Sequence, residues 1–210
     1  ATTRMIDWAR QNGCEVRGHT LVWPSFRRSP ERLAALRGSP DKLREEIRKH
    51  IADVVTANKG KIRAWDVMNE PTTNFEFMQL LGEAEPAEWF KQAHEIDPSA
   101  QMFLNENQIL AGTKLRSLEL HLDKLLKYGA PLGGIGIQGH LGVGTAAPQQ
   151  ILEIFDRLSR YNVPLSITEL DVVSDNQEEQ AMYLRDVLTA AFSHPAVDSV
   201  TFWGFWDGRH

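Results

Sequence analysis

Two glutamates, Glu70 and Glu169, are the residues of this sequence best suited to acid–base chemistry as a pair. If two carboxyl groups converge on one cleft, they can hydrolyse a glycosidic bond: one donates a proton to the leaving oxygen, and the other attacks the anomeric carbon or activates a water. Glu70 also has a structural interpretation, as a surface carboxylate at a helix N-terminus. Glu169 is harder to explain in that way, because Ile167 and Leu170 flank it in an apolar run.

Further residues of the kinds that bind sugars fall at the ends of short apolar runs. They are His19, Trp23, Asn69, Gln138, His140, Asp171 and Trp203. Taken singly, each has a structural explanation: the histidines and tryptophans as core residues, the amides as partners of a neighbouring strand, and Asp171 as a helix cap. Together they are costly to place in a core that packing alone would fill with Val, Ile and Leu, so they indicate a binding site.

Apolar residues at helical spacing alternate along the chain with short β-rich runs. The predicted helices cover 3–12, 40–58, 86–96, 113–128, 148–161 and 177–193, with a shorter turn at 30–37, and the predicted strands cover 14–23, 61–69, 101–105, 134–141, 164–172 and 197–205. Strands that alternate with helices indicate βα units and a parallel sheet. The predicted strand ends follow one another at steps of 47, 35, 35, 31 and 33 residues. A near-constant step of this size favours a (β/α)₈ barrel, in which the chemistry lies at the carboxyl ends of the strands.

Alternation along a strand decides which of these candidates can act together. Residues an even number apart face the same side, so His19 pairs with Trp23 and Gln138 pairs with His140. Adjacent residues face opposite sides. We therefore expect Asn69 and Glu70 to serve one site only if their strand bulges or ends there.

Composition excludes several classes of protein. The chain has 210 residues, 42% of them hydrophobic, which is too apolar for a disordered chain. Its net charge of −5, with no basic run, gives no reason to expect nucleic acid or a membrane surface as a partner. No apolar run approaches the roughly 18 residues of a membrane span. The single cysteine, Cys14, excludes a disulfide framework within the chain, and its position at the start of a strand predicts a small buried side chain.

Five blocks of the sequence together resemble the signature blocks of glycoside hydrolase family 10. They are Arg17–Trp23, Trp65–Pro71, Ile135–Leu141, Ile167–Asp171 and Thr201–Gly204, and they occur in the order of the family and span nearly the whole chain. The resemblance implies a (β/α)₈ barrel and the activity of an endo-β-1,4-xylanase. It also implies xylan or a xylo-oligosaccharide as the substrate, no cofactor, no metal ion, and secretion from the cell.

The resemblance also implies a role for each candidate residue. Glu70 is implied as the general acid/base and Glu169 as the nucleophile of a double displacement that retains the anomeric configuration. Asn69 would hold the 2-hydroxyl of the sugar being cleaved, and His140 would bond Glu169 with Asp171 behind it. Gln138 would lie between the two glutamates. The subsite of the attacked sugar would be lined by His19, Trp23 and Trp203.

The sequence departs from the pattern of the family at three places. Pro24 stands where the family usually has a second histidine. The run Asn105-Glu106-Asn107-Gln108 replaces the usual Asn-Asp-Tyr-Asn and lacks the tyrosine that the resemblance would place in a stacking contact on the leaving side of the substrate. The segment 204–210 differs from the usual Gly-Val-Thr-Asp. These departures indicate a distinct subgroup, and we expect substrate detail to differ with them.

Three other functions stay open at this stage. One is a retaining β-glucanase or mannanase of the same clan, and another is a carbohydrate-binding barrel that is inactive through truncation. The third is a metal-dependent hydrolase that would use His19, His140, Glu169 and Asp171, although no His-x-His pair supports it.

Length gives the last expectation. A barrel of this kind takes about 250 residues, and only six strands are predicted here, which would be strands 3–8. We therefore expect residues 1–210 to be a single catalytic barrel domain, truncated at both ends, with two exposed strand edges. If these residues were the whole expressed chain, we would expect weak or no activity and poor solubility.

Overall fold

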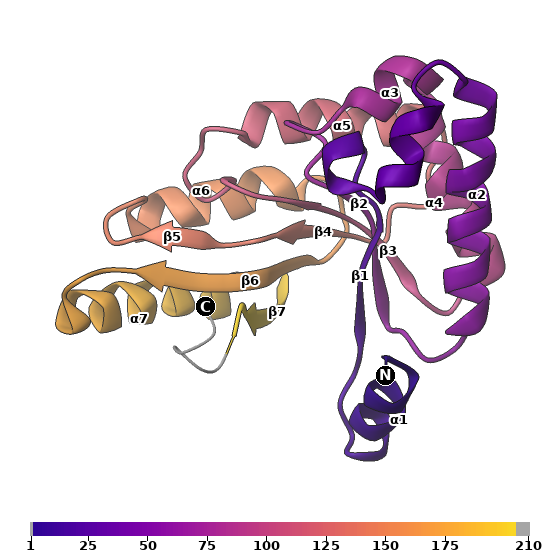
Figure 1. Cartoon of the computed structure of the whole chain (residues 1–210). Coiled ribbons are helices and arrows are strands. Elements are labelled where there is room, and N and C mark those ends of the chain that lie inside the picture. The colour runs from indigo at the N-terminus through magenta and orange to yellow at the C-terminus, as the bar shows by residue number, and fades with distance from the viewer. Residues whose placement is uncertain (1, 205–210) are drawn as a thin grey trace. The chain divides into compact units, whose positions relative to one another are not determined.

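The helices and strands alternate as predicted in the computed structural model, which describes residues 2–204 (Figure 1). The chain divides into two compact units. Among the described residues, the first unit comprises the chain up to residue 104 together with 122–133, and the second comprises the rest. Two elements, β3 (Gln101–Glu106) and α5 (Leu115–Lys127), contribute residues to both units.

The first unit carries the strands that end near the first set of site candidates. Its elements are α1 (Thr2–Gln11), β1 (Arg17–Val22), the 3₁₀ helices η1 (Phe26–Arg28) and η2 (Glu31–Leu36), α2 (Pro40–Ala57), β2 (Ala64–Asn69), α3 (Glu76–Leu81) and α4 (Glu85–Ile96). The strand order is β1-β2-β3, and β1 and β2 run parallel. Proline stands in the first turn of α2 and of α4, where it has no hydrogen bond to lose.

The core of the first unit forms around β2. All six residues of β2 are buried, as is typical of a parallel strand covered on both faces. The α2 helix buries one stripe at helical spacing, and α4 buries Trp89, Phe90 and Ala93. β1 approaches β2 closely because Gly18 lies opposite Trp65, and a Cβ at Gly18 would lie 2.2 Å from the Trp65 ring.

The second unit forms around β6, the longest strand of the chain's described part. Its elements are β4 (Gly134–Ile137), β5 (His140–Gly142), α6 (Pro148–Ser159), β6 (Leu165–Val173), α7 (Gln177–Ser193) and β7 (Val197–Phe202). β6 pairs in parallel with β4, β5 and β7, and α7 lies along β6 (Figure 1). This parallel arrangement confirms the α/β prediction. The expectation of one domain over residues 1–210 stays a prediction.

Some local expectations differ from the structure. The sequence gives no signal for α3, and the run 134–141 is two strands because Gly139, with φ of 83°, interrupts it. The apolar periodicity of 3–12 places Met5, Ile6, Trp8 and Ala9 on one stripe, but of these only Ile6 is buried, while Met5 and Trp8 are 70% and 65% exposed. Cys14 is exposed rather than buried, because it lies in the connection before β1 instead of in the strand.

Within the described residues, no helix combines the length and the apolar character needed to cross a bilayer.

Candidate active site

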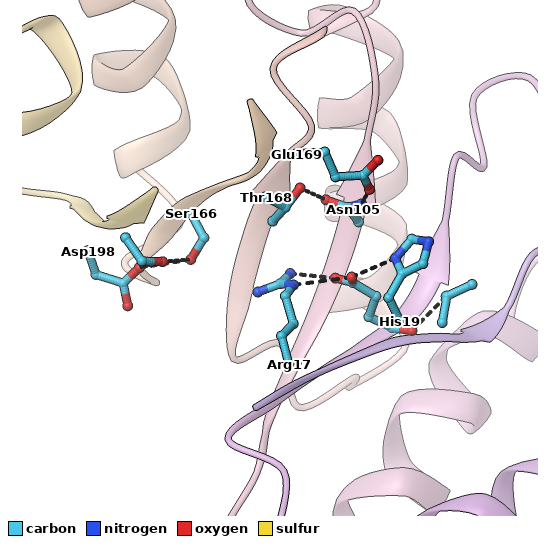
Figure 2. Close-up of polar contacts among 10 residues, drawn as sticks. Arg17, His19, Asn105, Ser166, Thr168, Glu169 and Asp198 are labelled. Atoms are coloured by element: carbon cyan, nitrogen blue, oxygen red, sulfur yellow. Dashed lines mark hydrogen bonds and ion pairs between the residues drawn. The ribbon is translucent and has the colours of Figure 1, made fainter. Parts of the chain in front are cut away.

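In the first unit, His19 on β1 is held by a buried aspartate of β2. Its Nδ1 lies 2.9 Å from Oδ2 of Asp66, which is 1% exposed. Arg17 donates two hydrogen bonds to the same carboxylate, and Nε of Arg17 lies 3.1 Å from Oδ2 (Figure 2). The Thr20 hydroxyl donates to the main-chain oxygen of Asp66. These contacts orient the His19 ring, and they depend on the register that places His19 opposite Asp66.

Trp23 lies directly after β1. Its ring stands nearly perpendicular to that of His19, with 6.3 Å between the ring centroids, and the Arg28 guanidinium lies 4.7 Å over it. The indole N–H of Trp23 is buried and has no hydrogen-bond acceptor among residues 2–204. A flat aromatic face with a donor beside it is a suitable contact for a sugar ring.

Asn69 and Glu70 are adjacent, so they can serve one site only if their strand bulges or ends there, and the strand does end there. β2 ends at Asn69, and Glu70 has a positive φ of 52°, so the alternation stops between them. The turn that follows is closed by Asn74, whose Nδ2 lies 3.2 Å from the main-chain oxygen of Glu70 and 3.3 Å from its Oε2. A non-glycine residue in this backbone region costs free energy, about 1–3 kcal/mol, and such strain gathers at functional sites.

In the second unit, Glu169 on β6 has a partner on each carboxylate oxygen. Asn105 donates its Nδ2–H to Oε1 over 3.0 Å, and His140 Nε2 lies 3.2 Å from Oε2. Thr168 donates its hydroxyl to Oδ1 of Asn105 over 2.7 Å, which fixes the amide so that its N–H groups face Glu169 (Figure 2). Glu169 itself is 7% exposed. Its carboxylate is therefore buried and oriented by hydrogen bonds.

His140 lies between two carboxylates. Its Nδ1 is 2.9 Å from Oδ2 of Asp171, the residue opposite it in the pairing of β5 with β6. The hydrogen bond with Glu169 raises the pKa of the imidazole, burial lowers it, and the contacts with Asp171 raise it further, so that the net pKa lies above the ordinary 6.5. The ring also meets Trp203 edge-to-face, with 5.3 Å between the centroids.

Gln138 lies between β4 and β5 and is 2% exposed. Its main chain connects β3 with β6. The N–H of Gln138 donates to the main-chain carbonyl of Glu106 over 2.9 Å, and its carbonyl accepts from the main-chain N–H of Glu169 over 2.8 Å. Gly139, with its φ of 83°, then turns the chain. Glycine is needed here because a Cβ would lie 2.9 Å from the Ile167 side chain. This turn brings His140 back beside β6.

Each unit thus gathers part of the predicted site. The first unit holds His19, Trp23, Asn69 and Glu70, and the second holds Gln138, His140, Glu169, Asp171 and Trp203. The convergence of Glu70 with Glu169 stays a prediction. Of the segment that departs from the family pattern at the end of the sequence, residues 205–210 lie outside the described residues.

Sequence reasoning did not assign roles to four residues that hold the candidates in place: Arg17, Asp66, Asn74 and Asn105. Asn105 offered a signal, because a polar residue that ends an apolar strand is costly unless it is used. Across residues 2–204, no group of three or more His, Cys, Asp or Glu side chains is arranged to hold a metal ion.

Curated relatives of the chain include proteins named as xylanases and one named as an anti-sigma factor. The chain is 37% identical over 208 residues to endo-1,4-beta-xylanase 2 of Arabidopsis thaliana, which covers 97% of this chain and 19% of the relative. It is 33% identical over 207 residues to the anti-sigma-I factor RsgI6 of Acetivibrio thermocellus, covering 98% of this chain and 27% of the relative. The chain thus spans about a fifth to a quarter of the length of these relatives.

Solved xylanases share the fold. Xylanase 10B of Thermotoga maritima superposes with a TM-score of 0.88 at 26% identity, covering 97% of this chain and 67% of that one. XynB of Paenibacillus barcinonensis, in complex with a conduramine derivative, gives 0.88 at 30% identity, covering 100% and 71%. Xylanase 10B of Thermotoga petrophila RKU-1, in complex with xylobiose, gives 0.88 at 26%, covering 97% and 66%. These likenesses confirm the prediction that the strands belong to a (β/α)₈ barrel.

The sequence model of glycosyl hydrolase family 10 matches residues 1–210. The match extends over both units and over every candidate residue, so that the chain belongs to glycosyl hydrolase family 10.

Proposed function

We propose that this chain is the catalytic part of a retaining endo-glycosidase that cleaves β-1,4-xylosidic bonds in xylan by double displacement. The observation that carries the proposal is the environment of Glu169, a buried carboxylate with Asn105 on one oxygen and His140 on the other. A nucleophile needs this kind of fixed orientation, because a misplaced attacking atom lowers the rate steeply.

The reaction follows from two carboxyl groups in different protonation states. In the first step, Glu169 attacks the anomeric carbon and forms an ester, while Glu70 gives its proton to the leaving oxygen. In the second step, Glu70 takes a proton from water, and the hydroxide attacks the same carbon and releases Glu169. The mechanism requires the two carboxyl groups to lie about 5–5.5 Å apart.

The other residues have supporting roles in the proposal. His140, oriented by Asp171, compensates for the charge of Glu169 before attack, while Gln138 connects the strands on either side of it. His19, Trp23 and Trp203 offer ring faces to the attacked sugar, and Asn69 offers an amide to its 2-hydroxyl.

Xylan is the proposed substrate because of the names of the relatives. Endo-1,4-beta-xylanase 2 of Arabidopsis and the Thermotoga petrophila complex with xylobiose both point to β-1,4-linked xylose. A polymeric substrate that does not enter cells favours secretion. We also propose that residues 1–210 work as one catalytic barrel domain, without a cofactor.

The test is a reducing-sugar assay of the full-length protein on xylan, β-glucan and mannan. We expect xylan to be cleaved fastest and Glu169→Ala to abolish cleavage. Azide should rescue Glu169→Ala with inversion of configuration and Glu70→Ala with retention, on a substrate with a good leaving group. Glu88→Ala, which removes an exposed carboxylate of α4, is the matched control. Retained products from both site variants, or a preference for glucan, would contradict the proposal.

A second candidate is carbohydrate binding without hydrolysis. One relative is named an anti-sigma-I factor rather than a xylanase. Calorimetry with xylohexaose distinguishes the two functions, since binding with no release of shorter products would favour the second.

A further inference from the structure

Lys114 lies in the connection between β3 and α5, after the run Asn105–Gln108 that departs from the family pattern. Its Nζ lies 3.5 Å from Oε1 of Glu106 and also contacts Oδ1 of Asn107. The side chains of Lys114 and Glu106 are 14% and 0% exposed. Asn107 donates its main-chain N–H to Oε1 of Glu106 over 2.9 Å. The three residues thus form a connected cluster in which Lys114 lies beside the buried carboxylate of Glu106.

Glu106 is linked to Glu169 by two routes within the second unit. One route uses side chains: Asn105, the residue before Glu106, donates to Oε1 of Glu169. The other uses the main chain: the carbonyl of Glu106 accepts from Gln138, whose own carbonyl accepts from the N–H of Glu169. A displacement of Glu106 would therefore move both the amide that orients the Glu169 carboxylate and the strand that carries it.

A buried carboxylate stays in place only when its charge is compensated. Without Lys114, the buried Glu106 carboxylate would lose a compensating positive charge, so it would either move towards water or act on Glu169 with its negative charge. The groups already close to Glu169 include His140, which carries a positive charge when protonated, and Asp171, which adds a negative one behind that ring. Lys114 supplies a positive charge that does not depend on the titration of His140.

We infer that Lys114 is a positioning residue for Glu169: it compensates for the buried charge of Glu106 and so holds Asn105 and Gln138 in the arrangement that orients the nucleophile. The inference rests on the proposed function, because it takes Glu169 as the nucleophile. It also gives a role to Asn107, which stands where the resemblance leads us to expect a tyrosine and which binds Lys114 here.

The experiment measures kcat/KM against pH for the full-length protein on an aryl β-xylobioside. In Lys114→Met, we expect a roughly 10- to 100-fold loss and an acid limb that moves up by about one pH unit. Lys114→Arg keeps the charge and should keep the wild-type profile. Glu106→Gln should move the acid limb down, and the double variant Lys114→Met/Glu106→Gln should regain the wild-type limb. Lys49→Met, an exposed lysine of α2, is the matched control.

An acid limb that stays in place in folded Lys114→Met would overturn the inference, because a residue that only holds the loop together would lower stability without moving the limb. If Lys114→Met does not fold, Glu106→Gln decides, and an unmoved limb there would overturn the inference equally.

The proposed function is judged separately, by cleavage of xylan by the wild-type protein. If the wild type cleaves nothing, the carboxyl ¹³C chemical shift of Glu169 at one fixed pH still decides the role of Lys114. The chemical shift should change in Lys114→Met and keep its wild-type value in Lys114→Arg and Lys49→Met, and equal chemical shifts in all variants would refute the inference.

Discussion

His140 Nε2 lies 3.2 Å from Oε2 of Glu169, and the opposite nitrogen of the ring lies 2.9 Å from Asp171. Only the protonated imidazole can donate to both carboxylates, because the neutral ring keeps a lone pair on one nitrogen. The pair with Glu169 is therefore strongest when His140 carries a charge.

The first prediction concerns the titration of His140. Its pKa lies above 6.5, with the Glu169 hydrogen bond as the largest cause, so NMR of the ring should show a midpoint above that value. In Glu169→Gln, the midpoint should fall, because the neutral amide loses the charge of the carboxylate. Glu153→Gln, on the exposed part of α6, should leave it unchanged. Equal midpoints in the wild type and in Glu169→Gln would refute this account.

A pH dependence of stability follows from the same shift. Because the folded pKa of His140 is raised, its contribution to the free energy of unfolding is fully present below the ordinary pKa of 6.5 and is lost as pH rises through the folded value. Urea unfolding between pH 5 and pH 9 should show this loss in the wild-type protein and a smaller one in His140→Asn.

The second prediction concerns Asn105. In Asn105→Ala, Glu169 loses the donor on Oε1 while His140 still holds Oε2. We expect kcat/KM to fall roughly 10- to 100-fold, mostly through kcat, because the carboxylate is less well oriented for attack. Steady-state kinetics on an aryl β-xylobioside measures the change, and Asn12→Ala, on the exposed chain after α1, is the control. A change in KM alone would argue for a substrate contact instead.

The candidate site was more predictable from the sequence than the contacts that hold it. Glu169 is recognisable because it interrupts an apolar strand. Asn69 and Glu70 are recognisable because they are polar residues at the end of a predicted strand. Asn105 was recognisable only as a polar strand end, because its pairing with Glu169 depends on how two strands far apart in the sequence come together. The exposed stripe of α1 could not be predicted either, since periodicity shows that residues share a face but not that another element covers it.

The third prediction concerns the close approach of β1 and β2. A Cβ at Gly18 would lie 2.2 Å from two carbons of the Trp65 ring, and Trp65 is buried. Gly18→Ala should therefore force the strands apart and lower the free energy of unfolding by about 1–3 kcal/mol. Gly38→Ala is the matched control, because a Cβ there meets nothing within 4 Å. Equal losses in the two variants, measured by urea unfolding, would show that the contact with Trp65 does not matter.

The fourth prediction concerns Asp97, the buried residue that ends α4. Its Oδ2 accepts the main-chain N–H of Gly60 over 2.8 Å, and its Oδ1 accepts the main-chain N–H and the hydroxyl of Ser99. Burial alone would raise the pKa of the carboxyl, but the hydrogen bonds from Ser99 and Gly60 lower it more, so that the net pKa lies below the ordinary 3.8.

A depressed folded pKa gives stability that is present above the unfolded value and is lost as pH falls through the folded one. The free energy of unfolding of the wild-type protein should therefore decrease below about pH 4 through this group. Asp97→Ala removes the acceptor of the main-chain N–H groups of Gly60 and Ser99, so it should cost about 1 kcal/mol at neutral pH and should weaken the acid dependence. Asp53→Ala, which removes a 63% exposed carboxylate from α2, should change neither. If Asp97→Ala keeps the wild-type slope between pH 5 and pH 2, the stabilising hydrogen bonds do not favour the ionised carboxylate.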